Sequence, residues 1–206
     1  PVPVPWVGRT AGGREAETVK EMFYTAIDVG STKMCTIIAK IGAEGELKIL
    51  GSGIVPSQGV QKGRVESIPD TQQAVKASLE EAQRYLGRGV DWAYMGVTGT
   101  HISCLNTSSV LEGVRGDGAI SSQDVQQLIR SSYPEVADGK EVLHVIPMSY
   151  VVDGLTGVRN PVNLHADRVQ VDSHVVMGDA TVLKNMVRAV EGCKLSVRSL
   201  VHQPLA

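Results

Sequence analysis

Aromatic residues are scarce in this 206-residue sequence, and only one of them is a Phe. Its hydrophobic core must therefore rest on Val, Ile, Leu and Ala. No apolar run approaches the length that crosses a bilayer as a helix. Net charge is also small, at −2, so the chain has no basic field to attract nucleic acid or an anionic membrane. We therefore expect neither a nucleic-acid partner nor a membrane-spanning helix.

Cysteine is the second scarce residue type. The three cysteines, Cys35, Cys104 and Cys193, are odd in number and far apart, and each lies in an apolar run. This pattern favours small buried residues in a reducing cytoplasm over a disulfide framework or a catalytic thiol. The five histidines show no pair at i, i+4, so His101 has no second ligand at metal spacing and a metal site of that kind is not expected.

The most informative stretch present is a polar turn between two apolar, β-prone runs, residues 24–27 and 34–41. A glycine in such a turn frees the backbone, while backbone N–H groups, hydroxyls and an ammonium group suit phosphate. An aspartate at the strand end suits a hydrated Mg²⁺. An ordinary hairpin with a polar tip is the alternative. The candidate ligand-binding residues are Asp28, Gly30, Ser31, Thr32 and Lys33.

The remaining pattern is that of an α/β protein. Residues 1–21 are rich in Pro and Gly and are predicted to be a disordered tail outside the fold. The expected elements are a strand at 46–54, a turn-rich loop at 55–63, a helix from Ser67 or Asp70 to about Leu86, a strand at 92–99, strands within 102–114, a capped helix from Ser121, two strands within 142–162, a strand at 168–177, a helix after Asp179 and a strand at 195–201.

Several motifs carry a resemblance to known families. The segment 27–33, Ile-Asp-Val-Gly-Ser-Thr-Lys, resembles the first phosphate loop of the actin/Hsp70/sugar-kinase superfamily. Three further segments resemble the bacterial cell-division family FtsA: Pro-Ser-Gln-Gly-Val-Gln-Lys-Gly at 56–63, Gly-Thr-His-Ile at 99–102, and the run from Leu143 to Val162. The last of these is the most specific.

The resemblance implies a fold and a ligand. It predicts an actin-like (ribonuclease H-like) first subdomain in two segments, 22–100 and 171–206, interrupted by a small α/β SHS2-type subdomain at 101–170. It also implies that the chain is the N-terminal part of a longer protein that binds ATP and Mg²⁺, with Asp28 on the metal through water. No catalytic residue is assigned. At most a weak ATPase is expected of the longer protein, and none of this chain.

The same resemblance implies a cellular role. FtsA-like proteins polymerise and tether the FtsZ ring to the cytoplasmic membrane, and they recruit later division proteins, here through residues 101–170. The expected location is cytoplasmic and peripheral, on the inner face of the membrane at the division site. FtsZ and the membrane would be contacted through a second lobe and a C-terminal helix that this sequence does not contain. The alternatives are a PilM-like pilus-assembly ATPase, a sugar or acetate kinase, and an α/β interaction module without a ligand.

Overall fold

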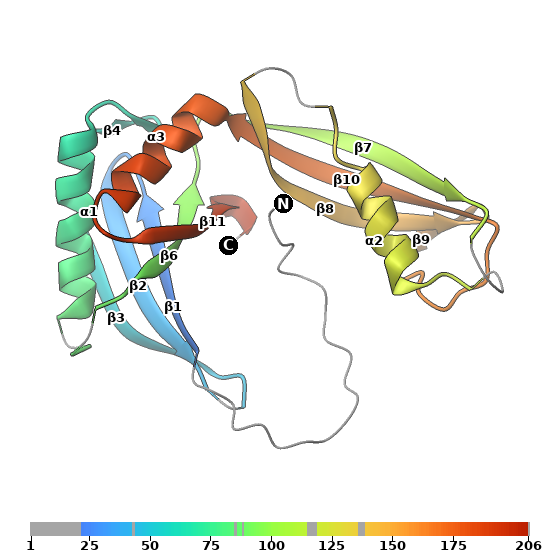
Figure 1. The fold of residues 1–206 in the computed structure, drawn as a ribbon, viewed down its shortest axis with the longest axis horizontal. Helices are drawn as coiled ribbons and strands as arrows, with labels where there is room; N and C mark the ends of the chain where they lie inside the picture. The colour runs from blue at the N-terminus through green and yellow to red at the C-terminus, as the bar shows by residue number, and fades with distance from the viewer. Residues whose placement is uncertain are drawn as a thin grey trace. The chain divides into compact units, whose positions relative to one another are not determined.

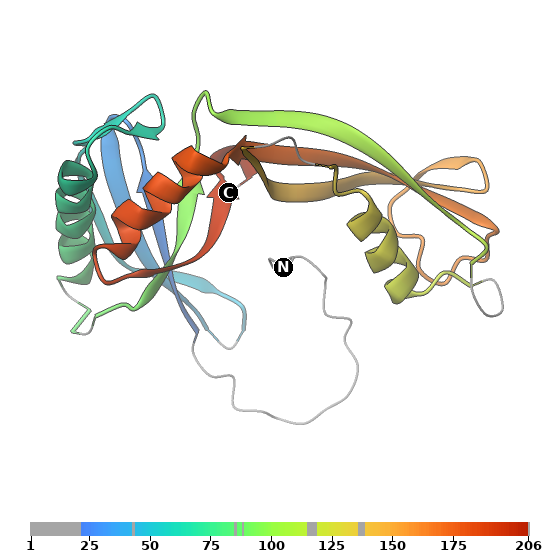
Figure 2. The same cartoon turned by 45° about the horizontal axis from the view of Figure 1, so that its top comes forward.

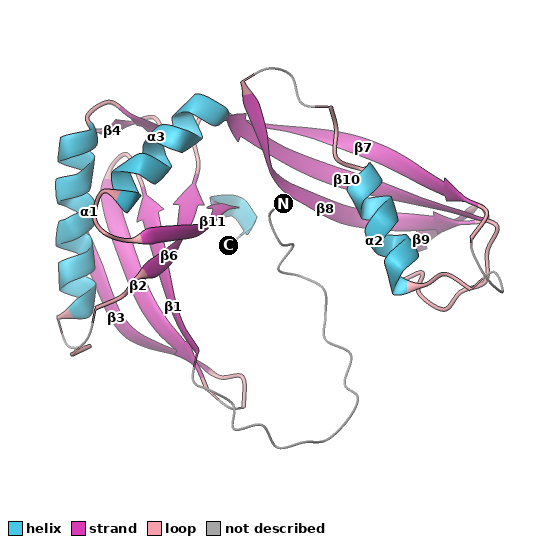
Figure 3. Ribbon diagram, in the orientation of Figure 1, coloured by secondary structure: helices cyan, strands magenta, loops and turns pink. Residues whose placement is uncertain are grey.

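The computed structural model describes residues 22–42, 44–84, 86–87, 89–114, 119–135 and 139–205. The predicted tail at 1–21 lies outside the described residues, as does most of the glycine-rich connection at 113–118. The chain divides into two compact units. The first contains the residues up to Val97 together with Asn185–Pro204, and the second contains Thr98–Lys184 (Figures 1 and 3).

The first unit is built on a five-stranded sheet of order β11-β6-β1-β2-β3. The first three strands form an antiparallel meander, whereas β6 and β11 run parallel to β1. The strands predicted at 24–27, 34–41 and 46–54 are therefore confirmed. The strands are β1 (Met22–Val29), β2 (Lys33–Ile41), β3 (Leu47–Pro56), β6 (Trp92–Val97) and β11 (Ser196–His202).

Helix α1 (Ile68–Gln83) packs closely on β2 and β3. Two glycines of β3 allow this approach: a Cβ on Gly53 would lie 1.9 Å from the Ser78 carbonyl oxygen, and one on Gly51 would lie 2.0 Å from that of Ala82. The Ser78 hydroxyl also forms a buried 2.8 Å hydrogen bond with the Thr36 hydroxyl. The helix begins at the expected cap, Ser67, but it ends at Gln83, short of Leu86.

The second unit has a four-stranded antiparallel sheet of order β7-β10-β8-β9. Helix α2 (Ser122–Ser131) lies on one face of it (Figure 2), and Leu128 inserts into the core beside Val169 and Val171. The predicted capping box is present, because Ser121 and Asp124 exchange side-chain to backbone hydrogen bonds. The strands are β7 (Ile102–Glu112), β8 (Lys140–Val152), β9 (Leu155–Val158) and β10 (Arg168–Asp179).

The second unit extends beyond the expected range of 101–170. Strand β10 pairs with β7 and β8 along almost its whole length, so it belongs to this sheet and does not lead directly back to the first unit. Helix α3 (Ala180–Glu191) makes that return. The stretch 102–112 is one continuous strand where several were expected, and the 55–63 loop leads into a short hairpin, β4 (Val60–Gln61) and β5 (Arg64–Val65).

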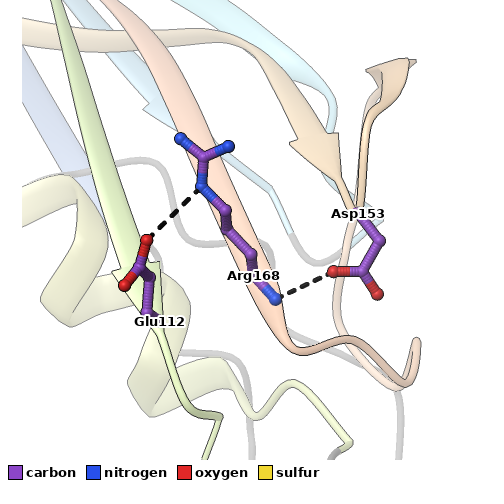
Figure 4. A network of polar contacts seen from close by, with 3 residues as sticks. All are labelled: Glu112, Asp153 and Arg168. Atoms are coloured by element: carbon purple, nitrogen blue, oxygen red, sulfur yellow. Dashed lines mark hydrogen bonds and ion pairs between the residues drawn. The ribbon is translucent and has the colours of Figure 1, made fainter.

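The turn between β8 and β9 fixes the start of β10. Asp153 and Gly154 both adopt positive φ, at 45° and 86°, which suits a two-residue hairpin turn. The Asp153 carboxylate accepts hydrogen bonds from the backbone N–H groups of Arg168, at 2.9 Å, and Asp167, at 3.2 Å. The Arg168 side chain lies 3.7 Å from Glu112 on β7, so this residue of β10 connects β7 with the β8–β9 turn (Figure 4). Within the described part of the chain, no helix is both long and apolar enough to cross a membrane.

The close approach of α1 predicts the effect of Gly53→Ala. The added methyl group would overlap the Ser78 carbonyl oxygen, a backbone atom that cannot move without displacing the helix. We expect the variant to lose about 2–3 kcal/mol of unfolding free energy, measured by urea denaturation. Gly89→Ala is the control, because nothing lies within 4 Å of a Cβ there, and its change should stay within about 0.5 kcal/mol. Equal effects of both variants would contradict this packing.

The capping box predicts a smaller loss in the second unit. Ser121→Ala removes the hydroxyl that accepts the Asp124 N–H at 3.1 Å, leaving a donor of the first turn of α2 without its partner. The unfolding free energy should fall by about 1 kcal/mol, measured in the same denaturation assay. Ser122→Ala, one residue further on at an exposed position, is the matched control and should be close to neutral. The cap would be ruled out as a stabilising contact if the two variants behaved alike.

Candidate nucleotide-binding turn

The structure brings all five predicted site residues together in the connection between β1 and β2. Asp28 is the last residue but one of β1, and Lys33 is the first of β2, with three residues between the strands. The side chains of Ser31, Thr32 and Lys33 are exposed, while Asp28 is half-buried. The turn therefore presents two hydroxyls and an ammonium group to solvent beside one recessed carboxylate.

Gly30 is required at this turn by space. Its φ is not in the left-handed region, so the requirement for glycine does not come from a positive φ. A Cβ at this position, however, would lie 2.6 Å from the Lys33 carbonyl oxygen and 3.9 Å from the Asp28 carboxylate. A side chain at residue 30 would thus push the two ends of the turn apart, and the turn would lose its present shape.

The turn lies at an edge where three parallel strands end. Asp28 on β1 is level with Gly96 on β6, and Gly96 is level with Val201 on β11. Carboxyl ends of parallel strands form the usual ligand-binding edge of an open α/β sheet. Gln203, directly after β11, reaches this edge as well, since a Cβ on Gly96 would lie 3.5 Å from its Cγ. Sequence reasoning missed Gln203, although a polar residue after a third parallel strand was the available signal.

Asp28 is the unusual residue of the site. Its Oδ1 atom is buried and has no hydrogen-bond partner among the described residues. Burial raises the pKa of this carboxyl, and the nearby positive charge of Lys33 lowers it in part. A recessed carboxylate oxygen without a donor is costly in a folded protein, because it has lost water and gained nothing in its place. Such an oxygen fits a hydrated cation brought in by a ligand.

Cys35 lies opposite Asp28 in the β1–β2 register. Burial raises the pKa of its thiol, the Asp28 charge raises it further, and Lys33 lowers it. The thiol is therefore protonated at neutral pH and is a poor nucleophile. All three cysteines are free, as expected. The prediction that they are buried is wrong for Cys104, which is exposed on β7, and only partly met by Cys35 and Cys193, which are half-buried.

The segment 57–63 forms hydrogen bonds with the turn. The Ser57 hydroxyl donates to the Gly30 carbonyl oxygen at 2.6 Å, and the Ser57 N–H donates to that of Thr32 at 3.0 Å. Gly63 N–H then donates to the Ser31 hydroxyl oxygen, also at 3.0 Å. Three consecutive turn residues are thus held by the 57–63 segment, for which sequence reasoning had predicted only a loop.

The chain's own side chains do not make a complete metal site in the part that the structure describes, where no three His, Cys, Asp or Glu side chains cluster at metal-binding distance. A cation at Asp28 would need oxygen ligands from water and from a bound phosphate, which is how Mg²⁺ is commonly held beside nucleotides. His101 lies in a turn and is buried, with 1% of its surface exposed.

Comparison with known proteins identifies the second unit first. Residues 99–177 match the family described as the SHS2 domain inserted in FtsA. The cell division protein FtsA of Pseudomonas aeruginosa is 29% identical over 181 residues, which are 87% of this chain and 43% of that protein. FtsA of Escherichia coli K12 gives the same figures, and FtsA of Neisseria meningitidis is 25% identical over 91% of this chain and 45% of its own length.

A solved structure agrees with the fold. The PilM–PilN type IV pilus biogenesis complex superposes with a TM-score of 0.59 over 88% of this chain and 47% of the matched chain, at 13% identity. That likeness concerns the architecture alone. The chain spans less than half the length of the FtsA proteins that it matches. It is similar in sequence to the FtsA proteins, and its fold is an actin-like subdomain interrupted by an SHS2 domain.

Proposed function

We propose that this chain is the part of an actin-like cell-division protein that holds the phosphates of ATP at the turn between β1 and β2. The observation that carries the proposal is the buried Asp28 Oδ1 without a partner, beside three exposed polar side chains at the carboxyl edge of parallel strands. This arrangement supplies what a magnesium–nucleotide complex needs, namely donors for phosphate and a carboxylate for the hydrated cation.

Each site residue has a distinct role in this proposal. Ser31 and Thr32 donate their hydroxyl protons to phosphate oxygens, and Lys33 contributes a point charge. Asp28 accepts hydrogen bonds from the water that surrounds Mg²⁺. The metal, when bound, neutralises the charge of the β- and γ-phosphates. Gly30 allows the turn its close shape, because a Cβ there would overlap the Lys33 carbonyl oxygen.

The relatives support a proposal for the wider role. FtsA homologues are cell division proteins by name, and this chain resembles them over both of its units. We propose that the protein self-associates, tethers an FtsZ ring at the inner face of the membrane at the septum, and recruits later division proteins through the SHS2 unit. We propose that other parts of the full-length protein contact FtsZ and the membrane.

Two other functions receive less support. A sugar or acetate kinase needs a general-base carboxylate beside the phosphate turn, and Asp28 is the only carboxylate of the turn itself. A PilM-like pilus role is compatible with the fold, but it rests on a likeness at 13% identity, whereas the sequence matches are to FtsA. We propose at most a weak ATPase activity in the full-length protein and none in this chain.

Titration of the ¹⁵N-labelled chain with ATP and Mg²⁺, followed by NMR, tests the nucleotide proposal. We expect shifts confined to residues 28–33 and their neighbours, with a Kd on the order of 1 mM, because the turn offers only a few contacts, which are exposed to solvent. Lys33→Met should weaken binding about tenfold. Lys48→Met, an exposed lysine near the far end of β3, is the matched control.

The nucleotide site and the cell-division role are tested by separate experiments. If saturating ATP and Mg²⁺ left the resonances of residues 28–33 unmoved, the nucleotide site would be refuted. Depletion of the protein in its native cells tests the division role separately. Long cells without septa are expected, and normally dividing cells would refute that role whatever the result of the titration.

Asp28 gives a prediction on stability. Its raised pKa means that the folded state favours the protonated carboxyl. Protonation of Asp28 therefore stabilises the fold. This contribution to the free energy of unfolding is full below the ordinary pKa of 3.8 and is lost as the pH rises through the folded-state pKa. Asp28→Asn should therefore unfold at a higher urea concentration than the wild type at pH 7. The difference between the two urea midpoints should disappear below pH 3.8. The variant should also bind ATP and Mg²⁺ less well.

The control for this variant is Glu80→Gln, which removes one negative charge from the exposed face of α1. It should change neither the urea midpoint nor ATP binding appreciably. A loss of stability in Asp28→Asn at pH 7 would show that the carboxylate makes a stabilising contact in the fold, which contradicts a residue kept for a ligand.

A further inference from the structure

The hairpin of β4 and β5 places its tip directly on the candidate nucleotide-binding turn. Lys62 and Gly63 form this tip, between the paired residues Gln61 and Arg64. Both adopt positive φ, at 50° and 74°. Gly63 N–H donates to the Ser31 hydroxyl oxygen at 3.0 Å. Because that oxygen accepts from Gly63, the Ser31 hydroxyl proton is left to point elsewhere, for example at a ligand.

Hydrogen bonds at the base of the hairpin hold the tip in place. Gly59, just before the hairpin, accepts hydrogen bonds at its carbonyl oxygen from the N–H groups of Glu66, at 2.8 Å, and Ser67, at 3.2 Å. Ser67 is also the cap of α1. The hairpin is thus tied to the start of a helix on one side and to the turn on the other, so the direction in which Lys62 leaves the backbone is fixed.

Distance allows the Lys62 ammonium group to reach a ligand on Ser31. The Lys62 Cα is two covalent bonds, or less than about 3 Å, from the Gly63 nitrogen. That nitrogen lies 3.0 Å from the Ser31 Oγ. The Lys62 Cα is therefore within about 6 Å of Ser31 Oγ, a span that the flexible four-carbon stem of lysine covers.

The exposed charge of Lys62 and its left-handed backbone conformation both favour a role in ligand binding. Its side chain is exposed, and no ion pair engages it among the residues that the structure describes. Lys33 is likewise exposed and without an ion pair there. In addition, both central positions of such a hairpin turn favour Gly, Asn or Asp, yet the first of them here is a lysine in the left-handed conformation. The chain accepts this strain and gains a cation beside the turn.

We propose that Lys62, presented beside Ser31 by the β4–β5 tip, is a second cationic ligand for the polyphosphate of the bound nucleotide. This inference rests on the proposed function, since it assigns a further residue to the same site. Lys33 and Lys62 then supply positive charge to one phosphate chain. The Ser31 hydroxyl, whose oxygen accepts from the Gly63 N–H, binds the same phosphate chain.

Three variants of Lys62 test the assignment, with ATP and Mg²⁺ as the probe in the NMR titration. Lys62→Met should weaken binding roughly fivefold and make it less dependent on KCl concentration, because one charge contact is lost. Lys62→Arg should retain most of the affinity. Lys62→Gly should weaken binding as much as Lys62→Met while raising the urea midpoint, because glycine adopts the left-handed conformation without strain.

Lys62→Gly is expected to weaken ATP binding and to raise the urea midpoint. This combination distinguishes a ligand-binding role from a structural one, since removing a structural lysine would lower the stability of the fold. Lys48→Met on β3 is again the control. Binding by Lys62→Met within twofold of the wild type, alongside a loss in Lys33→Met, would overturn the role of Lys62 and leave the proposed nucleotide site intact. If the wild type showed no binding at all, both would be overturned.

Discussion

The parallel pairing of β1, β6 and β11 is the constraint on which the site depends. Parallel strands bring their carboxyl ends to one edge, so Asp28, Gly96 and Gln203 meet there although they are far apart in the sequence. The connection from β6 to β11 must be long, because parallel neighbours cannot be joined by a tight hairpin. In this chain that connection contains the whole second unit, with its own sheet and core.

The second unit can occupy that connection because it is complete in itself. Its sheet is antiparallel throughout, and α2 covers a core that includes Ile120, Leu128 and Val171. The chain leaves the first unit after β6 and returns within α3. The SHS2 unit and the candidate nucleotide-binding turn can therefore share one chain without sharing a core, since each lies in its own unit.

Much of the fold and most of the site could be predicted from the sequence, for identifiable reasons. The five turn residues and the Ser121 capping box were predicted because their spacing along the chain is local. The extent of the second unit was not, because the pairing of β10 with β7 is decided by contacts across the sheet. Gln203 and the 57–63 segment were missed for the same reason, since their places in the site come from hydrogen bonds and packing between residues distant in sequence.

The hydrogen bonds of the 57–63 segment have a consequence for how the first unit opens. Ser57 and Gly63 are bonded to the turn, and Gly59 is bonded to the start of α1. A segment tied in this way cannot fray on its own, as surface loops commonly do, because its release breaks contacts with two other elements. The turn, the segment and the first turn of α1 therefore form one cooperative unit of local unfolding, and a ligand that binds any of the three slows the opening of all.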